Sequence, residues 1–409
     1  MSLNQTPGGE RTHIAIFGRR NAGKSSLINA LTNQEVSIVS AVKGTTTDPV
    51  SKAMELLPLG PVVIIDTAGL DDEGALGALR VKRTHDVLNR TDIALLVMEA
   101  ETGIGDCERA LIAQVRAKHL PLVVVYNKAD LAVPSAAACK QAADQTQAPV
   151  HVVSSATREG VEDLKLALAR IVPEDDGKCR IVGDLLQPND LVVLVTPIDS
   201  AAPKGRLILP QQQTARDILE AGAIAVVARE TELRAALAGL GRKPRLVITD
   251  SQAFAQVAAD TPPDVPLTSF SILFARYKGD LEALVRGAKA VEKLKDGDRV
   301  LIAEGCTHHR QKDDIGTVKI PRWLKQHTGK ELVLEHTSGM KYPRDLKDYA
   351  LVVHCGACML NRREMHWRLA QAREAGVPIV NYGVLIAHLQ GILPRCLAPF
   401  PAAALALAP

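Results

Sequence analysis

The feature that most restricts the fold of this chain is a glycine-rich loop between an apolar run and a helical pattern. Residues 13–25 read HIAIFGRRNAGKS, which contains the G-x-x-x-x-G-K-[ST] spacing. In a strand–loop–helix context, backbone N–H groups around Gly23 and the start of the helix bind phosphates. Lys24 then reaches the β- and γ-phosphates, and the Ser25 hydroxyl is a ligand of Mg²⁺. The loop therefore predicts a nucleotide-binding α/β domain.

Three further motifs follow in order, each at the end of an apolar run. The first is VVIIDTAG, in which Asp66 would hold Mg²⁺ through water and the Gly69 N–H would sense the γ-phosphate. The second is NKAD, and the third is SSA, which would close the base pocket. Apart from one switch threonine, the residues expected to bind the nucleotide are Asn21, Ala22, Gly23, Lys24, Ser25, Ser26, Asp66, Gly69, Asn127, Lys128, Asp130, Ser154, Ser155 and Ala156.

The NKAD motif predicts which base is bound. Asp130 can accept hydrogen bonds from the N1–H and 2-amino groups of guanine, and a bidentate base contact of this kind contributes about 1–3 kcal/mol. Adenine lacks both donors, so its binding would leave the carboxylate unpaired. The predicted ligand is therefore GTP, which is hydrolysed to GDP, and not ATP.

Continuous apolar runs predict parallel sheets along the whole chain. In the first part they alternate with helical patterns, such as 24–31 and 161–171, as in a doubly wound α/β domain. The charged linker PEDDGKCR precedes a second βα series, and the Pro-rich TPPDVP ends it. We expect an α/β protein of three domains, with two smaller α/β domains after the first. The expected bounds are a disordered tail at 1–10 and domains at 11–173, 174–265 and 266–409.

Composition restricts the cellular compartments and the classes of partner that we expect for this protein. The seven cysteines are sparse and odd in number, which is not the pattern of a secreted disulfide framework. The N-terminus has no apolar signal-peptide core, and the apolar C-terminal tail is too short to span a bilayer. Net charge is only +3 and aromatic residues are 3%, so a nucleic-acid partner is not indicated. We expect a cytoplasmic protein with reduced thiols and no membrane partner.

A second site is indicated near the C-terminus by HCGACM at 354–359. Cys355 and Cys358 precede a helical pattern expected at 359–375, and CTHHR upstream supplies Cys306 and His308. Two strands would end at cysteines, and the carboxyl ends of parallel strands are where ligands bind. Three thiolates with imidazoles nearby suit zinc or an iron–sulfur cluster, and a following helix N-terminus favours an anionic cluster.

The remaining histidines and cysteines have plainer interpretations. His308 and His354 are both possible fourth ligands, and the sequence does not choose between them. Four other histidines are interpreted as solvated or structural: His309, His327, His336 and His366. Cys107, Cys139 and Cys179 lie in the first domain or the linker, outside any ligand spacing. Cys396 follows the last helical stretch and could lie near the cysteine site, but we do not count it as a ligand.

The loop KGTTTDPV at 43–50 gives the first resemblance. A switch loop here must supply a threonine to Mg²⁺, and the residues alone allow Thr45, Thr46 or Thr47. The chain resembles the TrmE-Era-EngA-like GTPases, and this resemblance implies Thr46. It also places Asn21 where potassium-dependent members hold K⁺ near the β–γ bridge, where a cation acts as an arginine finger does.

The residues expected to carry hydrolysis are therefore Asn21, Lys24, Thr46 and Asp66. Leu70 stands where Ras-type GTPases have a water-orienting glutamine, and its side chain has no hydrogen-bonding group. Hydrolysis is therefore expected to be slow and K⁺-stimulated.

A GTPase domain, an α/β middle and the joined CTHHR and HCGAC motifs resemble the FeFe-hydrogenase maturation GTPase family, HydF, over nearly the whole chain. The resemblance implies a 4Fe-4S cluster on Cys306, Cys355 and Cys358 with an open or exchangeable fourth site. It implies a homodimer formed by 174–265 and a cluster-binding domain at 266–409. Members of this family are scaffolds for the H-cluster, which receive a two-iron precursor from radical-SAM maturases and deliver it to apo FeFe-hydrogenase.

Two other functions are compatible with parts of the pattern. One is a ribosome- or RNA-associated GTPase with a structural Cys₃His zinc site. The chain lacks a basic GxxG-type RNA module and stacking aromatics, which disfavours this function. The other is a structural metal protein with a vestigial GTPase, and intact Lys24, Asp66 and Asp130 argue against it.

Overall fold

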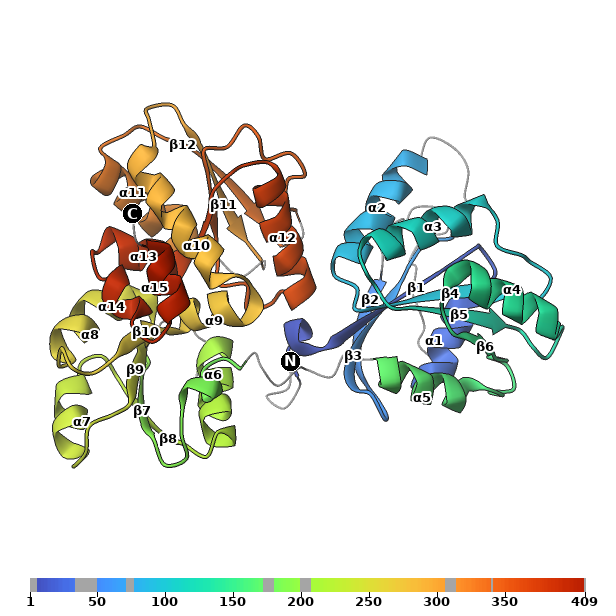
Figure 1. Ribbon diagram of the computed structural model, residues 1–409, viewed down its shortest axis with the longest axis horizontal. Coiled ribbons are helices and arrows are strands. Elements are labelled where there is room, and N and C mark those ends of the chain that lie inside the picture. The colour runs from blue at the N-terminus through green and yellow to red at the C-terminus, as the bar shows by residue number, and fades with distance from the viewer. Residues whose placement is uncertain are drawn as a thin grey trace. The chain divides into compact units, whose positions relative to one another are not determined.

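The computed structural model describes residues 6–33, 50–70, 77–171, 180–198, 207–305, 314–339 and 341–407. The chain divides into two compact units, Met1–Glu174 and Asp175–Pro409 (Figure 1). Among the described residues, no helix combines the length and apolarity needed to cross a membrane.

The first unit contains a six-stranded sheet in the order β2-β3-β1-β4-β5-β6, with helices on both faces (Figure 1). Only β2 is antiparallel to its neighbour; the other pairings are parallel. The strands are β1 (Thr12–Gly18), β2 (Val50–Leu56), β3 (Gly60–Asp66), β4 (Ile93–Glu99), β5 (Leu122–Asn127) and β6 (Val150–Val152). The helices are α1 (Lys24–Thr32), α2 (Gly77–Asn89), α3 (Asp106–Ala117), α4 (Ala136–Thr146) and α5 (Val161–Ile171).

The central strand β1 is buried on both faces because its side chains alternate between two cores. Ile14 and Ile16 pack with residues of α1 and α5, whereas Ala15 and Phe17 pack with residues of α2, α3 and α4. β1 lies between β3 and β4, so the strand order reverses at β1. In open α/β sheets, ligands bind at this reversal, beyond the carboxyl ends of the strands. The glycine-rich loop follows β1 at this edge.

Residues 6–10, the described part of the expected tail, are not disordered. Gly8–Glu10 form a 3₁₀ turn in which Gly9 is buried. The guanidinium of Arg11 explains this order, because its Nε donates to Thr6 O at 2.7 Å and its Nη1 to Met54 O at 2.8 Å. The side chain therefore attaches residues 6–10 to β2.

The second unit contains two four-stranded parallel sheets, in the orders β10-β9-β7-β8 and β12-β11-β13-β14. The first consists of β7 (Leu191–Val195), β8 (Ile224–Ala228), β9 (Leu246–Thr249) and β10 (Leu267–Ser269). The second consists of β11 (Arg299–Glu304), β12 (Val333–Ser338), β13 (Leu351–His354) and β14 (Ile379–Asn381). Larger helices are α6 (Leu209–Glu220), α7 (Leu233–Gly239), α8 (Phe254–Asp260), α9 (Phe270–Lys278), α10 (Leu281–Ala288), α11 (Ile320–Thr328), α12 (Arg362–Glu374) and α13 (Tyr382–Leu389). Two short helices, α14 (Leu393–Leu397) and α15 (Pro401–Leu407), end the described chain.

The expected class, α/β with parallel sheets after a P-loop domain, is confirmed. The two sheets of the second unit are not independent, because one continuous core contains residues of both, such as Leu194 and Leu301. The expected boundary at 265/266 also moves. β10 follows the Pro-rich break, yet it pairs in parallel with β9, so the first sheet extends to Ser269.

The helix expected from residue 359 begins later, at Arg362. Asn361 follows a turn at 358–360, and its side chain accepts a hydrogen bond from the Glu364 N–H, which is a standard N-cap. Cys358 therefore lies in the turn before α12 and not at the helix N-terminus. The helix dipole is correspondingly farther from the thiol than the sequence predicts.

Candidate functional site

The glycine-rich loop is closed by contacts that only glycine permits. Gly23 caps α1 with a φ of 84°, and a Cβ there would lie 2.3 Å from Nδ2 of Asn127. The same Nδ2 donates to the backbone oxygens of Ala22 and Gly23 at 3.3 and 3.2 Å. Lys24 Nζ donates to Gly18 O and Arg19 O at 3.1 and 2.8 Å, within the loop itself. The loop is thus preformed, and its lysine is held by the carbonyl oxygens of the loop itself.

The Mg²⁺ ligands predicted from two separate motifs are brought together. Ser25 Oγ donates to Asp66 Oδ2 at 3.1 Å. Asp66 Oδ1 is buried and has no hydrogen-bond partner among the described residues. Burial raises the pKa of Asp66, against the opposing effects of Ser25 and Lys24. An unpartnered buried carboxylate oxygen beside a serine hydroxyl fits a divalent cation or its water, so these residues fit Mg²⁺.

The loop after Asp66 is held against β1 at two points. Thr67 Oγ1 donates to Ile16 O at 2.7 Å, and Leu70 N donates to Gly18 O at 3.1 Å. Gly69 lies between them, beside the glycine-rich loop. The Leu70 side chain is partly buried against the sheet. Since leucine has no hydrogen-bonding group, it offers none to a water molecule at this place.

The base-reading motifs are joined through Asn127, which is only 1% exposed. Its Oδ1 accepts hydrogen bonds from Ser155 N at 3.1 Å and Ser155 Oγ at 2.8 Å. Ser154 Oγ donates to Asp130 Oδ1 at 2.5 Å and orients a carboxylate that is otherwise exposed. Lys128, in a left-handed conformation, pairs with Glu99 at 2.5 Å. Asn127 therefore couples the phosphate loop to the base pocket.

Three other predicted residues of this site are exposed, and the predicted switch threonine is not among the described residues. Asn21 is exposed at the tip of the glycine-rich loop, with a φ of 65°. Ser26 and Ala156 are exposed as well. Thr46, with its alternatives Thr45 and Thr47, lies outside the described residues.

At the second site, strand register carries two cysteine-bearing segments to one sheet edge. β11 and β13 pair in parallel with Ala303 opposite His354, and Cys355 N donates to Ala303 O at 2.9 Å. Gly305 N then donates to Cys355 Sγ at 3.0 Å. Cys306 is the next residue in the chain, but Cys306, His308 and His309 lie outside the described residues.

The environment of the Cys-x-x-Cys pair suits a metal–thiolate site. Ala357 N is a second amide directed at Cys355 Sγ, at 3.4 Å, and Cys355 and Cys358 are both partly buried and not in a disulfide. Lys278 is 1% exposed, and its Nζ donates to Leu360 O at 2.7 Å and Cys358 O at 3.3 Å. Burial raises the pKa of Cys358, and the Lys278 ammonium opposes this. Amide donors and a buried cation stabilise negative sulfur, so the residues present fit an anionic cluster.

The structure assigns His354 to a different role from that of fourth ligand. Its ring is fully buried: Nδ1 bonds Cys355 O at 2.8 Å, and Nε2 lies 3.0 Å from Nη1 of Arg368. Arg368 can only donate, so Nε2 is the acceptor and the ring is neutral. Burial and the neighbouring guanidinium lower the pKa of His354 to about 3. Both nitrogens are in use, so His354 supports the loop and offers no atom to a cluster.

Lys278 and Arg368 were not foreseen from the sequence. Each is a basic residue in an ordinary helical pattern, and only its burial reveals its role. Of the other cysteines, Cys107 is exposed and Cys139 is half-buried, and burial in the core raises the pKa of Cys396 to about 12. Cys179 lies outside the described residues.

Three family models match the chain. Residues 13–128 match the 50S ribosome-binding GTPase model. Residues 181–279 match the hydrogen maturase F dimerization domain, and residues 282–399 match the hydrogen maturase F tetramerization domain. The first of these two models ends after β10 and α9, which agrees with the place of β10 in the first sheet of the second unit.

Curated relatives match only the N-terminal part. The tRNA modification GTPase MnmE of Desulfotalea psychrophila is 32% identical over 166 residues, which cover 40% of this chain and 35% of that protein. The GTPase Der of a Nitratiruptor species is 36% identical over 160 residues, covering 37% and 34%. The chain thus spans about a third of the length of these relatives. The structure of Aquifex aeolicus Era bound to GDP and aluminium fluoride has a TM-score of 0.36 at 19% identity, covering 53% of this chain and 92% of Era.

The N-terminal unit is a GTPase domain by its sheet order, its motifs and its family model. The second unit is matched over almost all its length by two domain models of a single family. The chain therefore belongs to the hydrogen maturase F family.

Proposed function

We propose that this chain is a GTP-hydrolysing scaffold for assembly of the FeFe-hydrogenase H-cluster. It would bind a 4Fe-4S cluster through Cys306, Cys355 and Cys358 and transfer a two-iron precursor to apo-hydrogenase. One observation carries the proposal. Gly305, which immediately precedes Cys306, donates its N–H to Cys355 Sγ, in a unit that matches hydrogen maturase F domains.

The cysteine site would work through charge compensation. When bound, a 4Fe-4S cluster held by these three thiolates would keep one position without a cysteine ligand, and this open position would supply the exchangeable site that transfer of the two-iron substrate needs. The amides of Gly305 and Ala357 lower the charge density on Cys355 Sγ, and Lys278 balances negative charge near Cys358. His308 remains the proposed histidine candidate for a fourth ligand, since His354 has no free nitrogen.

The nucleotide site would hydrolyse GTP to GDP and phosphate. Asp130 reads guanine, while Ser25, Asp66 and Thr46 hold Mg²⁺. Lys24 leaves its loop carbonyls to neutralise charge on the β- and γ-phosphates. Since Leu70 cannot orient water, the rate would be low without a second cation. The exposed Asn21 would provide a carbonyl oxygen for K⁺ at the β–γ bridge.

Oligomerisation would proceed through the second unit, as the names of the matching domain models suggest. β8 is an edge strand of its sheet, and Ile224 and Val227 on it are 43% and 49% exposed. Leu219 on the adjacent α6 is 61% exposed. An unpaired strand edge with exposed apolar side chains is suited to pairing with a second copy. We therefore propose a homodimer through β8, with radical-SAM maturases and apo-hydrogenase as further partners in the cytoplasm.

A ribosome- or RNA-associated GTPase with a structural zinc site is the second candidate. The 50S ribosome-binding GTPase model and the MnmE relatives favour it for the first unit alone. The second unit matches the two hydrogen maturase F domain models instead. The two candidates require different metals.

Anaerobic purification followed by iron and zinc analysis separates these candidates. A brown protein with about four irons per chain supports the scaffold, as expected for a 4Fe-4S cluster on Cys ligands. A colourless protein containing zinc supports the second candidate.

Variants then test the ligands after anaerobic reconstitution. Cys355→Ser should lose the reduced-cluster EPR signal and the ability to activate apo-hydrogenase, while GTP hydrolysis persists. The exposed Cys107→Ser is the matched control and should behave as wild type. Full cluster content and activation in Cys355→Ser would refute the cysteine assignment.

A further inference from the structure

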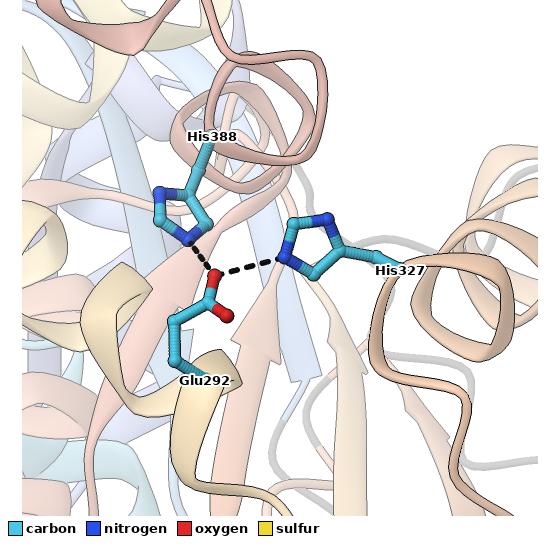
Figure 2. A group of neighbouring side chains, drawn as sticks. All are labelled: Glu292, His327 and His388. Carbon is cyan, nitrogen blue, oxygen red and sulfur yellow. Dashed lines mark hydrogen bonds and ion pairs between the residues drawn. The ribbon is translucent and has the colours of Figure 1, made fainter.

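A second cluster of metal-type side chains lies in the second unit, apart from the cysteines. Glu292 is on the 3₁₀ helix η4 (Lys289–Lys293), His327 is in the last turn of α11, and His388 is in the last turn of α13. Figure 2 shows the two imidazoles directed at one carboxylate oxygen. Glu292 Oε1 lies 2.8 Å from His327 Nε2 and 2.9 Å from His388 Nε2.

These spacings are close to those of ligands around one ion. A tetrahedral Zn²⁺ with metal–ligand bonds of about 2.0–2.1 Å places its ligand atoms about 3.3 Å apart, so each imidazole would move about 0.5 Å away from the carboxylate oxygen. One ligand atom from each of the three residues lies within 4.8 Å of the others. An ion could therefore replace the protons now shared between the imidazoles and the carboxylate, with small side-chain shifts. Two imidazoles and one carboxylate suit Zn²⁺ and Fe²⁺ and leave coordination positions open.

The surrounding backbone favours a cation at this place. His327 and His388 both lie in the C-terminal turns of their helices, where the macrodipole is negative. The carboxylate of Glu292 adds a full negative charge. Two helix ends from distant parts of the chain and one carboxylate thus converge on a single locus.

Space for an additional ligand is present on one side of the triad. A cavity of about 250 Å³ is lined by Trp323, Gln326, His327, Ile386, Leu389 and Gln390. His327 belongs both to the triad and to the cavity wall. Water or another small donor in the cavity would therefore have access to an ion on the triad.

We propose that Glu292, His327 and His388 bind a divalent transition-metal ion of the Zn²⁺ type. This site is independent of the cysteine site, because it uses only nitrogen and oxygen donors and lies on other elements. A metal-free hydrogen-bonded triad is the alternative that the experiment must distinguish.

The test is Co²⁺ binding to the full-length protein, with GDP and excess Mg²⁺ saturating the nucleotide site. Bound Co²⁺ is counted by metal analysis after equilibrium dialysis, and its absorption spectrum is recorded. Co²⁺ on cysteines gives thiolate-to-metal charge-transfer bands, whereas the triad should give d–d bands alone. Wild type should bind one more Co²⁺ per chain than either His327→Ala or His388→Ala. This additional Co²⁺ should contribute d–d bands and no charge-transfer bands.

Glu292→Gln keeps the side-chain shape and removes the charge, so it should weaken this site at least about tenfold. His119→Ala removes an exposed histidine of the first unit and should bind as wild type does. Circular dichroism of each variant verifies folding. Equal Co²⁺ content and identical d–d bands in wild type and the two histidine variants would overturn the proposal. So would unchanged affinity in Glu292→Gln.

Discussion

Substitution of the buried Arg368 should lower the stability of the second unit more than substitution at most other positions. Its guanidinium is 0% exposed and makes three contacts: Nε donates to Glu364 Oε1 at 2.9 Å, Nη2 to Gly339 O at 2.8 Å, and Nη1 to His354 Nε2 at 3.0 Å. It also lies over the ring of Tyr342, 4.8 Å from the centroid. Arg368 thus connects α12 to the end of β13, where the Cys-x-x-Cys turn begins.

Replacing Arg368 by Met removes the charge and keeps most of the volume. Glu364 is 3% exposed, and its Oε2 already lacks a hydrogen-bond partner among the described residues. The substitution therefore leaves a buried carboxylate without its cation, and breaking a buried pair in this way costs about 3–5 kcal/mol. Adding Glu364→Gln removes the uncompensated charge, so the double variant should recover at least about 1 kcal/mol.

Urea unfolding followed by tryptophan fluorescence measures this loss in the relevant unit. The two tryptophans of the chain, Trp323 and Trp367, both lie in the second unit. Arg373→Ala, on the exposed side of the same helix, is the control and should change stability by less than about 0.5 kcal/mol. An Arg368→Met loss below about 1 kcal/mol, or a double variant less stable than the single one, would refute the argument from the unpaired carboxylate.

Three other outcomes are expected. GTP hydrolysis in KCl should exceed that in NaCl by at least about tenfold, and Asn21→Ala should abolish the difference; equal wild-type rates in both salts would contradict the K⁺ site. Asp130→Asn should weaken GTP binding by about 1–3 kcal/mol and improve xanthosine triphosphate binding in competition with a fluorescent nucleotide, and an unchanged GTP affinity would exclude NKAD as the base reader. Ile224→Lys with Val227→Lys should convert a dimer to a monomer in light scattering, whereas Leu131→Lys, at a 78% exposed apolar position of the first unit, should not; an unchanged mass would remove β8 from the interface.

The nucleotide site was predictable because its information is local. Residues 18–25 run from the end of β1 through one loop to the start of α1, a segment whose own backbone is suited to phosphate, and Asp66 and Asn127 each end an apolar strand. Once parallel strands are assigned, their carboxyl ends must meet at one sheet edge, so the residues converge without further knowledge of packing. The same reasoning brought Cys355 to the end of β13.

Features that depend on contacts between distant residues could be determined only from the tertiary structure. β10 follows a Pro-rich break that suggests a boundary, but its pairing with β9 places it in the earlier sheet. His354 is a histidine beside a Cys-x-x-Cys pair, which is typical of a metal ligand. In the structure, however, both of its ring nitrogens make hydrogen bonds, to Cys355 O and to Arg368. Glu292 lies 35 residues from His327 and 96 residues from His388, so no sequence spacing connects them. Their convergence results from how η4, α11 and α13 pack on one core, and helix packing depends on side-chain interlocking across the whole unit and not on any local pattern.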